Sequence, residues 1–477
     1  MSKRWRVGCW SIVVVAFVCV AFAGGRAAAA QQSGSVPNWA EARDEAMRLL
    51  GDLIKIDTTN PPGNETKAAQ YLKTVLDREG IASQIFELEP GRGNIVARLK
   101  GSGKKRPILL MGHTDVVAVE RDKWSVDPFA AVVKDGYMYG RGASDNKNKV
   151  AAYLEVLLLL HRLKVPLDRD VIYMAQAGEE SSTRVGMDFM VEKHWDEIAC
   201  EFALDEGGVA HQRDGRVVYV GIATMEKVPR PGRLVAKGSP GHGSRPRPDN
   251  AIVHLAAAVA KVGTFQMPMR LNETTRRFFQ GLSKVSPPDE AYLFTHLEDP
   301  KASATVQETI RVKHLGYNSM LRTTISPTII SGGYRGNVIP SEAEANLDIR
   351  ILPDENLDAL EATLRSVIAD PVVEVSVSRR GRPVTPPSRL DSEMFRALER
   401  SASAAFPGVP TLPQVLSGAT DMAQLRARGV QAYGLGSVMT EDDASRIHGN
   451  DERVSVEGMG KFLQFVYGAV VEVAAAR

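Results

Sequence analysis

The sequence contains very little cysteine, with only three among its 477 residues. Cys9 and Cys19 lie inside an apolar N-terminal run, so removal of that run would leave Cys200 alone. A single thiol cannot form an internal disulfide, and it argues against ligation of a metal by several thiolates. Any metal site in this chain is therefore expected to use imidazole and carboxylate ligands.

The chain also lacks an excess of charge of either sign. It has 59 lysines and arginines against 57 aspartates and glutamates, which gives a formal net charge of +2. Nucleic-acid binding proteins carry a basic patch or stripe, and the balance found here argues against one. The expected partner is a small molecule, with no nucleic acid.

A long apolar run occurs only at the N-terminus. Basic residues precede an apolar run from Val7 to Ala23, and small residues follow as far as Ala30. This order is typical of a secretory signal, so the sequence predicts a signal peptide within residues 1–30, cleaved after Ala23 or after Ala30, and export, either to a periplasm or to the medium. The alternative is an uncleaved anchor, because the run approaches the length of a membrane helix. Membrane contact is not expected unless this segment is retained.

The rest of the chain has short apolar runs that alternate with amphipathic segments. Runs at 108–111, 171–175 and 202–204 have the length and composition of buried strands, and the segment after Asp145 has apolar residues at helical spacing. Strand and helix alternation of this kind predicts an α/β fold with a mostly parallel central sheet.

The pattern changes near Pro229, where alternating strands begin to flank helices. This predicts a smaller α+β domain inserted into the first, so that the expected organisation is a catalytic domain in two parts, 37–228 and 383–477, around an inserted domain at 229–382. The stretch from Thr264 to Ser326 is polar and predicts no regular structure. Gly101 to Lys105 is interpreted as a hairpin turn between two neighbouring strands.

Ionisable residues stand where the predicted strands end. His113 and Asp115 end the first run, Glu179 and Glu180 follow the second, and Asp145 precedes the amphipathic helix. Each is weak evidence alone, since Asp145 could cap the helix and paired glutamates usually face solvent. Together they predict a metal site, because the carboxyl ends of parallel strands meet at one edge of a sheet.

Nine segments, in order, resemble the motifs of the M20 family of metallopeptidases. They are Gly112-His-Thr-Asp115, Gly140-Arg-Gly-Ala-Ser-Asp145, Gly178-Glu-Glu180, Leu204-Asp-Glu-Gly-Gly208, Gly241-His-Gly-Ser-Arg-Pro246, Asn337-Val-Ile-Pro340, Asp348-Ile-Arg350, Ser417-Gly-Ala-Thr-Asp421 and Arg446-Ile-His-Gly449. The resemblance covers nearly all of the chain after the predicted signal. The segments around Leu204 and Leu321 look most like the aminoacylase and carboxypeptidase S branch. The resemblance implies a zinc-exopeptidase-like catalytic domain and, at 229–382, a lid domain of the type that forms dimers.

The resemblance implies two zinc ions per subunit bridged by Asp145, although cobalt or manganese would suit the same ligands. His113, Glu180 and His448 would supply further ligands. The resemblance implies one more acid. The similarity of its context to the carboxypeptidase S branch ranks Asp205 ahead of its neighbour Glu206, which the aminoacylase pattern would favour and which stays open as the alternative.

Two acids have other implied roles. Asp115 would accept the second ring proton of His113 and so fix its tautomer. Glu179 would act as general base, because its side chain should point away from that of the ligand Glu180.

Three residues of the predicted lid resemble substrate-binding positions. His242 would stabilise the oxyanion, in some relatives from a partner subunit, and Asn337 and Arg350 would hold the substrate. The alternatives are that His242 only caps a turn and that Arg350 is a surface charge on an edge strand. A homodimer is therefore one possible assembly.

The expected function is that of a dinuclear zinc-dependent hydrolase. It would cleave an amide bond next to a free carboxylate, as an exopeptidase or carboxypeptidase on small peptides or as an amidohydrolase on N-acyl amino acids. The alternatives are a biosynthetic deacylase of the same family and a metal-containing binding protein without turnover. The presence of the predicted base Glu179 argues against a binding protein without turnover.

Overall fold

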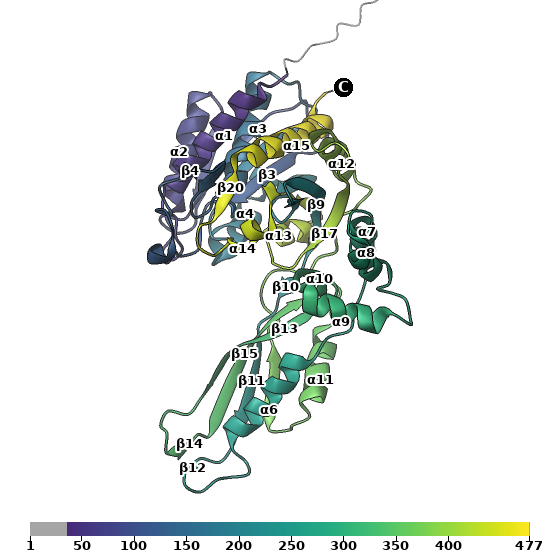
Figure 1. Cartoon of the computed structure of the whole chain (residues 1–477). Coiled ribbons are helices and arrows are strands. Elements are labelled where there is room, and N and C mark those ends of the chain that lie inside the picture. Colours follow the sequence, from purple (N-terminus) through teal and green to yellow (C-terminus); the bar gives the residue numbers. More distant parts are fainter. Residues whose placement is uncertain (1–35, 477) are drawn as a thin grey trace, which may run out of the picture. The chain divides into compact units, whose positions relative to one another are not determined.

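The computed structural model describes residues 36–476, so the predicted signal at 1–30 lies outside the described chain. Its largest element is a ten-stranded sheet with the strand order β1-β2-β6-β3-β7-β18-β9-β8-β19, in which β17 also pairs with β9 (Figure 1). The strands are β1 Ser83–Glu87, β2 Gly93–Leu99, β3 Ile108–His113, β6 Val171–Gln176, β7 Phe202–Asp205, β8 Val209–Arg213, β9 Arg216–Glu226, β17 Thr411–Leu416, β18 Gln431–Gly434 and β19 Val438–Met439. The neighbours β6, β3, β7 and β18 are parallel, which confirms the predicted mostly parallel centre.

Helices cover both faces of this sheet. One face carries α1 Trp39–Ile54, α2 Glu65–Arg78, α3 Lys147–Arg162, α12 Glu393–Ala405 and α15 Val456–Ala474, and the other carries α4 Met187–Lys193, α5 Trp195–Ile198 and α13 Met422–Ala427. Side chains of a strand alternate between the two faces. Leu110 of β3 accordingly belongs to the α3 and α15 side, while Leu109 and Met111 belong to the α4 and α13 side.

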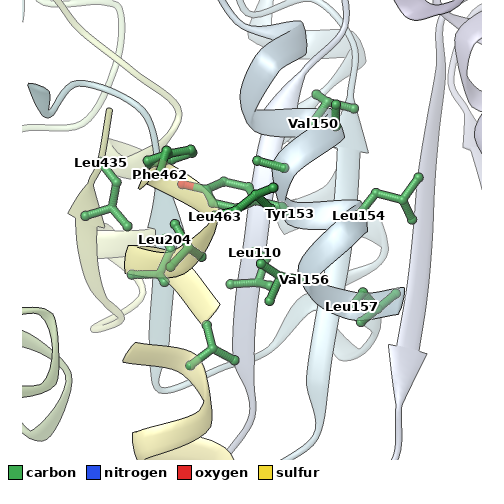
Figure 2. Packing of buried hydrophobic residues seen from close by; sticks show 14 of the residues in the cluster. Leu110, Val150, Tyr153, Leu154, Val156, Leu157, Leu204, Leu435, Phe462 and Leu463 are labelled. Atoms are coloured by element: carbon green, nitrogen blue, oxygen red, sulfur yellow. The ribbon is translucent and has the colours of Figure 1, made fainter. Parts of the chain in front are cut away.

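The α3 side of the sheet is the main core. Figure 2 shows Tyr153 of α3 near Leu110 and Leu204 of the sheet and near side chains of α15, and the ring centroids of Tyr153 and Phe462 are 6.1 Å apart. Almost every position of α3 is buried, because the helix packs against the sheet, α1 and α15 at once. This packing fixes the start of α3, and with it the loop that carries Asp145.

The second sheet has five antiparallel strands in the order β10-β15-β11-β16, with β13 on the free side of β15. Its elements are β10 Val228–Pro229, β11 Gly232–Lys237, β13 Thr324–Gly332, β15 Glu342–Ile351, β16 Val373–Val377, α6 Ala251–Thr264 and α11 Leu357–Ile368. The two helices bury their apolar faces against this sheet in a cluster of their own. A two-stranded ribbon of β12 Gly241–His242 and β14 Val338–Ile339 continues beyond the Lys237 and Glu342 ends of β11 and β15.

Four helices occupy the stretch from Thr264 to Ser326, so the prediction that it is irregular was wrong. They are α7 Glu273–Leu282, α8 Pro288–Thr295, α9 Ser303–Lys313 and α10 Leu315–Met320. Phe278, Phe279 and Phe294 pack with Tyr219 of β9 and Leu412 of β17. These helices therefore contact strands β9 and β17 of the ten-stranded sheet, and β17 is remote from them in the sequence.

The predicted hairpin at Gly101 to Lys105 is also wrong. β2 and β3 are not neighbours, because β6 lies between them, antiparallel to β2 and parallel to β3. The remaining elements are a small sheet of β4 Val132–Lys134, β5 Tyr137–Tyr139 and β20 Arg453–Ser455, the helix α14 Glu441–Ser445 and two short 3₁₀ turns, Arg121–Lys123 and Thr183–Val185.

Residues 36–476 belong to one compact unit, so the domain boundaries at 37–228, 229–382 and 383–477 stay a prediction. Among the helices of these residues, none has both the length and the hydropathy needed to cross a membrane.

Candidate metal centre

Several residues of the predicted site converge at the carboxyl ends of the parallel strands. His113 ends β3, Glu179 and Glu180 follow β6, and Glu206 follows β7. Because β6, β3 and β7 are adjacent and parallel, their ends lie side by side. The loop before α3 brings Asp145 to the same place.

Asp145 lies between two histidines. Its Oδ1 is 3.1 Å from Nε2 of His113, and its Oδ2 is 3.1 Å from Nε2 of His448. His448 Nε2 is also 2.9 Å from Oε1 of Glu180. Each oxygen of one carboxylate thus faces a different histidine, as expected of a carboxylate that bridges two metal ions.

Glu206, and not Asp205, faces this group. Glu206 Oε1 is 3.8 Å from Nε2 of His113, and single ligand atoms of His113, Glu179 and Glu206 all lie within 4.8 Å of one another. Asp205 is fully buried, and its backbone carbonyl accepts a hydrogen bond from Tyr153. The geometry favours the alternative that the sequence left open.

The donor set fits a divalent metal. Imidazole nitrogens and carboxylate oxygens suit zinc, cobalt or manganese, and no thiol belongs to either ligand group of the described residues. Cys200 lies in an apolar cluster, where burial raises the pKa of its thiol to about 12. A neutral thiol of this kind is not a metal ligand.

The acids of the site are crowded and buried, which shifts their pKa values. Burial raises the pKa of Glu180 and raises that of Glu179 well above its usual range. Burial acts in the same direction on Asp145, but hydrogen bonds from His113 and His448 hold its pKa well below the usual range. Hydrogen bonds to Asp145 and Glu180 raise the pKa of His448 to about 10. Metal binding to such a cluster must release these protons, so it will depend on pH.

Asp115 contacts His113 and the loop that carries Glu179 and Glu180. Nδ1 of His113 lies 3.0 Å from the backbone oxygen of Asp115 and 3.5 Å from its carboxylate. The carboxylate accepts hydrogen bonds from the backbone N–H groups of Glu179 and Glu180, each at 3.1 Å, and from Asn60 at 3.3 Å. Asp115 therefore fixes the ring of His113 chiefly through its carbonyl, and its carboxylate positions the loop with the two glutamates.

Sequence reasoning missed Glu452. This buried carboxylate accepts hydrogen bonds from the guanidinium of Arg141 at 2.7 Å and from the backbone N–H groups of Gly142, Ser144 and Asp145 at 3.0, 2.7 and 3.0 Å. It holds the loop that carries Asp145. The one signal in the sequence was its position four residues after His448.

Arg382 was missed as well. It lines a cavity of about 620 Å³ together with Glu179, Glu180, Glu206 and Arg350. Arg350, which was predicted, forms a two-point ion pair with Asp348, with distances of 2.7 and 3.1 Å. The cavity thus combines the carboxylates of the metal centre with two guanidinium groups.

His242 and Asn337 do not line this cavity. They lie on the ribbon of β12 and β14, where Gly243 N–H donates to the Asn337 carbonyl at 2.8 Å, and both are exposed. The ribbon follows the Glu342 end of β15, whereas Arg350 lies eight residues along that strand. At about 3.3 Å per residue, Arg350 therefore lies about 26 Å along β15 from the end that adjoins the ribbon.

A mostly parallel sheet with imidazole and carboxylate groups gathered at its carboxyl edge has the arrangement of an α/β hydrolase that can bind a metal. The model of the peptidase family M20/M25/M40 matches residues 109–472, and the chain belongs to this family. It is therefore an enzyme of the M20 type that acts on amide bonds, which confirms the resemblance seen in the sequence.

Three known proteins illustrate the similarity. The chain is 32% identical over 442 residues to the N-fatty-acyl-amino acid synthase/hydrolase PM20D1 of Xenopus tropicalis, covering 89% of this chain and 85% of that protein. It is 30% identical to the probable carboxypeptidase S-like 2 of Dictyostelium discoideum, over 76% of this chain and 70% of that one. The fold matches the M20 family metallo-carboxypeptidase Sso-CP2 of Sulfolobus solfataricus with a TM-score of 0.66 at 20% identity, over 90% of this chain and 99% of the other.

Proposed function

We propose that this enzyme is a dinuclear zinc hydrolase that cleaves an amide bond adjacent to a free carboxylate. The observation that carries the proposal is the position of Asp145, with one oxygen toward His113 and the other toward His448. One ion would be held by His113, Asp145 and Glu206, and the other by Asp145, Glu180 and His448. Zinc at these positions would lower the pKa of a bound water and polarise the scissile carbonyl, and cobalt or manganese would serve as well.

Glu179 is the proposed general base. Its carboxylate lies beside His113 and Glu206 but lines the cavity rather than the outer side of the loop. It would take a proton from the attacking water and pass it to the leaving amine. Its position on the wall of this cavity, with only 10% of the side chain exposed, suits a group that must hold and then release a proton.

The proposed substrates are small peptides and N-acyl amino acids. Arg350 lines the cavity and is about one-third exposed, so its guanidinium is accessible to a substrate carboxylate. The names of two similar proteins, an N-fatty-acyl-amino acid synthase/hydrolase and a probable carboxypeptidase S-like protein, support substrates of this kind.

The test is amine release from a panel of dipeptides and N-acyl amino acids by the chain from Gln31 onward. Chelator should abolish the activity, and added zinc should restore it. Glu179→Ala should remove activity while metal content, measured by elemental analysis, stays at two ions per chain. A folded, metal-loaded protein that turns over none of these substrates would support the binding-protein alternative.

We further propose a homodimer formed through the second sheet. Ile329 and Ile330 of the edge strand β13 are 59% and 58% exposed, and Val253 of the adjoining helix α6 is 62% exposed. An exposed apolar edge strand is a surface on which another strand can pair. Because the ribbon lies far from Arg350 in its own chain, His242 and Asn337 would reach only the site of the partner.

Mixing two inactive variants tests this assembly. His242→Ala and Glu179→Ala chains, each inactive alone, should regain activity when refolded together, since one site of each mixed dimer is then intact. A monomer by light scattering, or no recovery on mixing, would contradict the proposal.

Export is the remaining part of the proposal. Its support is the N-terminal order of basic, apolar and small residues, in which cleavage is proposed after Ala30, with Ala23 as the alternative. N-terminal sequencing of protein from the periplasm or medium of a secreting host should begin at Gln31. Protein retained in the cytoplasm with an intact N-terminus would contradict it.

A further inference from the structure

Arg382 lies where the chain returns from the second sheet to the first. It follows β16, and its backbone carbonyl accepts a hydrogen bond from the guanidinium of Arg230 at 2.9 Å. Arg230 itself follows β10 and also donates to the carbonyl of Pro229 at 2.8 Å. The two connections between the sheets are thus joined beside Arg382.

The side chain of Arg382 is committed to two carboxylates of the first sheet. Its Nη2 donates to Oε1 of Glu179 at 2.6 Å and to the backbone carbonyl of the same residue at 3.2 Å. Its Nη1 donates to Oδ1 of Asp421 at 2.8 Å. Only 13% of the side chain is exposed. The planar guanidinium therefore bridges two acids with a geometry that a single point charge cannot reproduce.

Asp421 is anchored in turn. Its side chain is fully buried, and its second oxygen, Oδ2, accepts a hydrogen bond from Nε2 of Gln176 at 2.5 Å. Gln176 is the last residue of β6, three residues before Glu179. A closed set of contacts thus runs from the end of β6 through Asp421 and Arg382 back to Glu179.

Arg350 provides the contrast within the same cavity. Its side chain is 35% exposed, and it forms an ion pair with Asp348 on its own strand. It can turn toward a ligand without leaving a buried acid unpaired. Arg382 cannot do so, because both Glu179 and Asp421 would lose their cation.

We infer that Arg382 is a positioning residue for the proposed base Glu179, holding one carboxylate oxygen so that the other faces the site of the attacking water. This inference depends on the role proposed for Glu179. Through the link to Arg230, it also connects the orientation of that carboxylate to the segments that join the two sheets.

The first experiment compares kinetic constants. Arg382→Gln should lower kcat about 100-fold, the scale of a misplacement of about 1 Å, with KM changed by no more than about two-fold and metal content unchanged. Arg382→Lys should fall between this variant and the wild type, because lysine keeps the charge but contacts one acid at a time. Unchanged kinetics, or a rise in KM at constant kcat, would overturn the inference; the latter result would show that Arg382 binds substrate.

Two further variants control for unrelated effects. Arg379→Gln removes an arginine three residues earlier that pairs with Asp358 on α11, and it should leave kcat and KM unchanged. Arg350→Gln removes the other arginine of the cavity, and it should raise KM while Glu179 keeps its position. If Arg382→Gln does not fold, as judged by circular dichroism, the folded Arg382→Lys variant decides by the same criteria.

Rescue by added guanidinium distinguishes a positioning role of Arg382 from a purely structural one. Millimolar guanidinium should restore part of the kcat of Arg382→Ala, because the small cation can occupy the place of the lost side chain. It should leave Glu179→Gln unaffected.

Crystal structures give a readout that does not require turnover. The Glu179 carboxylate should keep its contact in the wild type and move in Arg382→Gln, and an unmoved carboxylate would overturn the inference. This readout also separates the two hypotheses. A wild type with no hydrolase activity refutes the proposed function, while the position of Glu179 in the two crystals still decides whether Arg382 positions it.

Discussion

The two ends of this molecule that carry predicted functional residues differ in how those residues are held. At the carboxyl edge of the ten-stranded sheet, His113 and Asp115 are buried, and each contacts groups from other segments of the chain. On the ribbon of β12 and β14, His242 and Asn337 are exposed, and His242 contacts neighbours on or next to the ribbon: Ser244, Arg245 and its strand partner Val338.

This difference separates a candidate metal site, whose ligands all come from one chain, from a surface that one chain leaves open. The orientation of Asp145 is fixed by His113, His448 and Glu452 within the same chain. The ribbon and the neighbouring strand β13 present exposed polar and apolar groups without such contacts.

The largest expected effect comes from the base. Glu179→Gln keeps the shape of the side chain and one acceptor for Arg382 but cannot take up a proton, so kcat should fall about 10²- to 10⁴-fold. Bound metal should be retained, as measured by elemental analysis. Glu192→Gln, on the exposed side of α4, is the matched control and should behave as wild type. Equal loss of metal and activity in Glu179→Gln would instead indicate that Glu179 is a ligand.

A buried acid without a cation should make stability depend on pH. Glu155 of α3 is fully buried, neither of its oxygens has a hydrogen-bond partner among residues 36–476, and burial raises its pKa to about 8. The unfolded chain releases this proton near pH 4.5, whereas the folded chain keeps it until about pH 8. Folding therefore takes up a proton between these values, and stability falls as the pH rises through them.

Glu155→Gln removes this titration. The variant should be more stable than wild type by about 3 kcal/mol at pH 7 and by less than about 1 kcal/mol at pH 5, at about 1.4 kcal/mol per pKa unit. Urea unfolding at the two pH values measures the difference. An equal difference at both would show that Glu155 does not hold its proton in the folded chain.

Loss of the contact between Glu452 and the loop of Asp145 should lower the affinity of the site for metal. Glu452→Gln loses the charge that pairs with Arg141 and weakens the hold on the loop of Asp145. Removal of such supporting contacts typically lowers metal affinity about 10- to 100-fold. Competition with a chelator measures the change, and Glu457→Gln, an exposed acid on α15, should retain wild-type affinity. Unaltered affinity in a folded Glu452→Gln protein would show that the loop holds Asp145 without this carboxylate.

The same contrast explains how far the sequence could predict the structure. His113, Asp145 and Glu180 were predictable because apolar runs mark the strands and parallel strands end together. Arg382 and Glu452 were not, because their contacts join residues 203 and 307 positions apart, and neither residue follows a strand of the central sheet. A local pattern carries no information about such pairs.

Non-local packing also accounts for the errors in the fold. The hairpin at Gly101 was predicted from adjacency in the chain, but β6, which begins at Val171, lies between its two strands. The helices after Thr264 are short, and their aromatic residues pack against β9 and β17 as well as against one another. The pattern within this stretch therefore gave no clear helical signal. The choice between Asp205 and Glu206 was open for a similar reason, since neighbouring acids differ only in the direction that the sheet gives them.

The smallest effect on the single chain, and the clearest test of the open surface, is expected at β13. Ile329→Lys places a charge on an exposed edge strand, where lysine opposes pairing with another strand. The stability of the monomer should change by no more than about 0.5 kcal/mol, because the side chain is exposed. Light scattering should nevertheless show dissociation, and activity should fall because His242 no longer reaches a partner. Val133→Lys, at an equally exposed apolar position on β4, should leave the assembly intact. A dimer that survives Ile329→Lys would mean that the chains pair through another surface, and the exposed ribbon would then need a different partner.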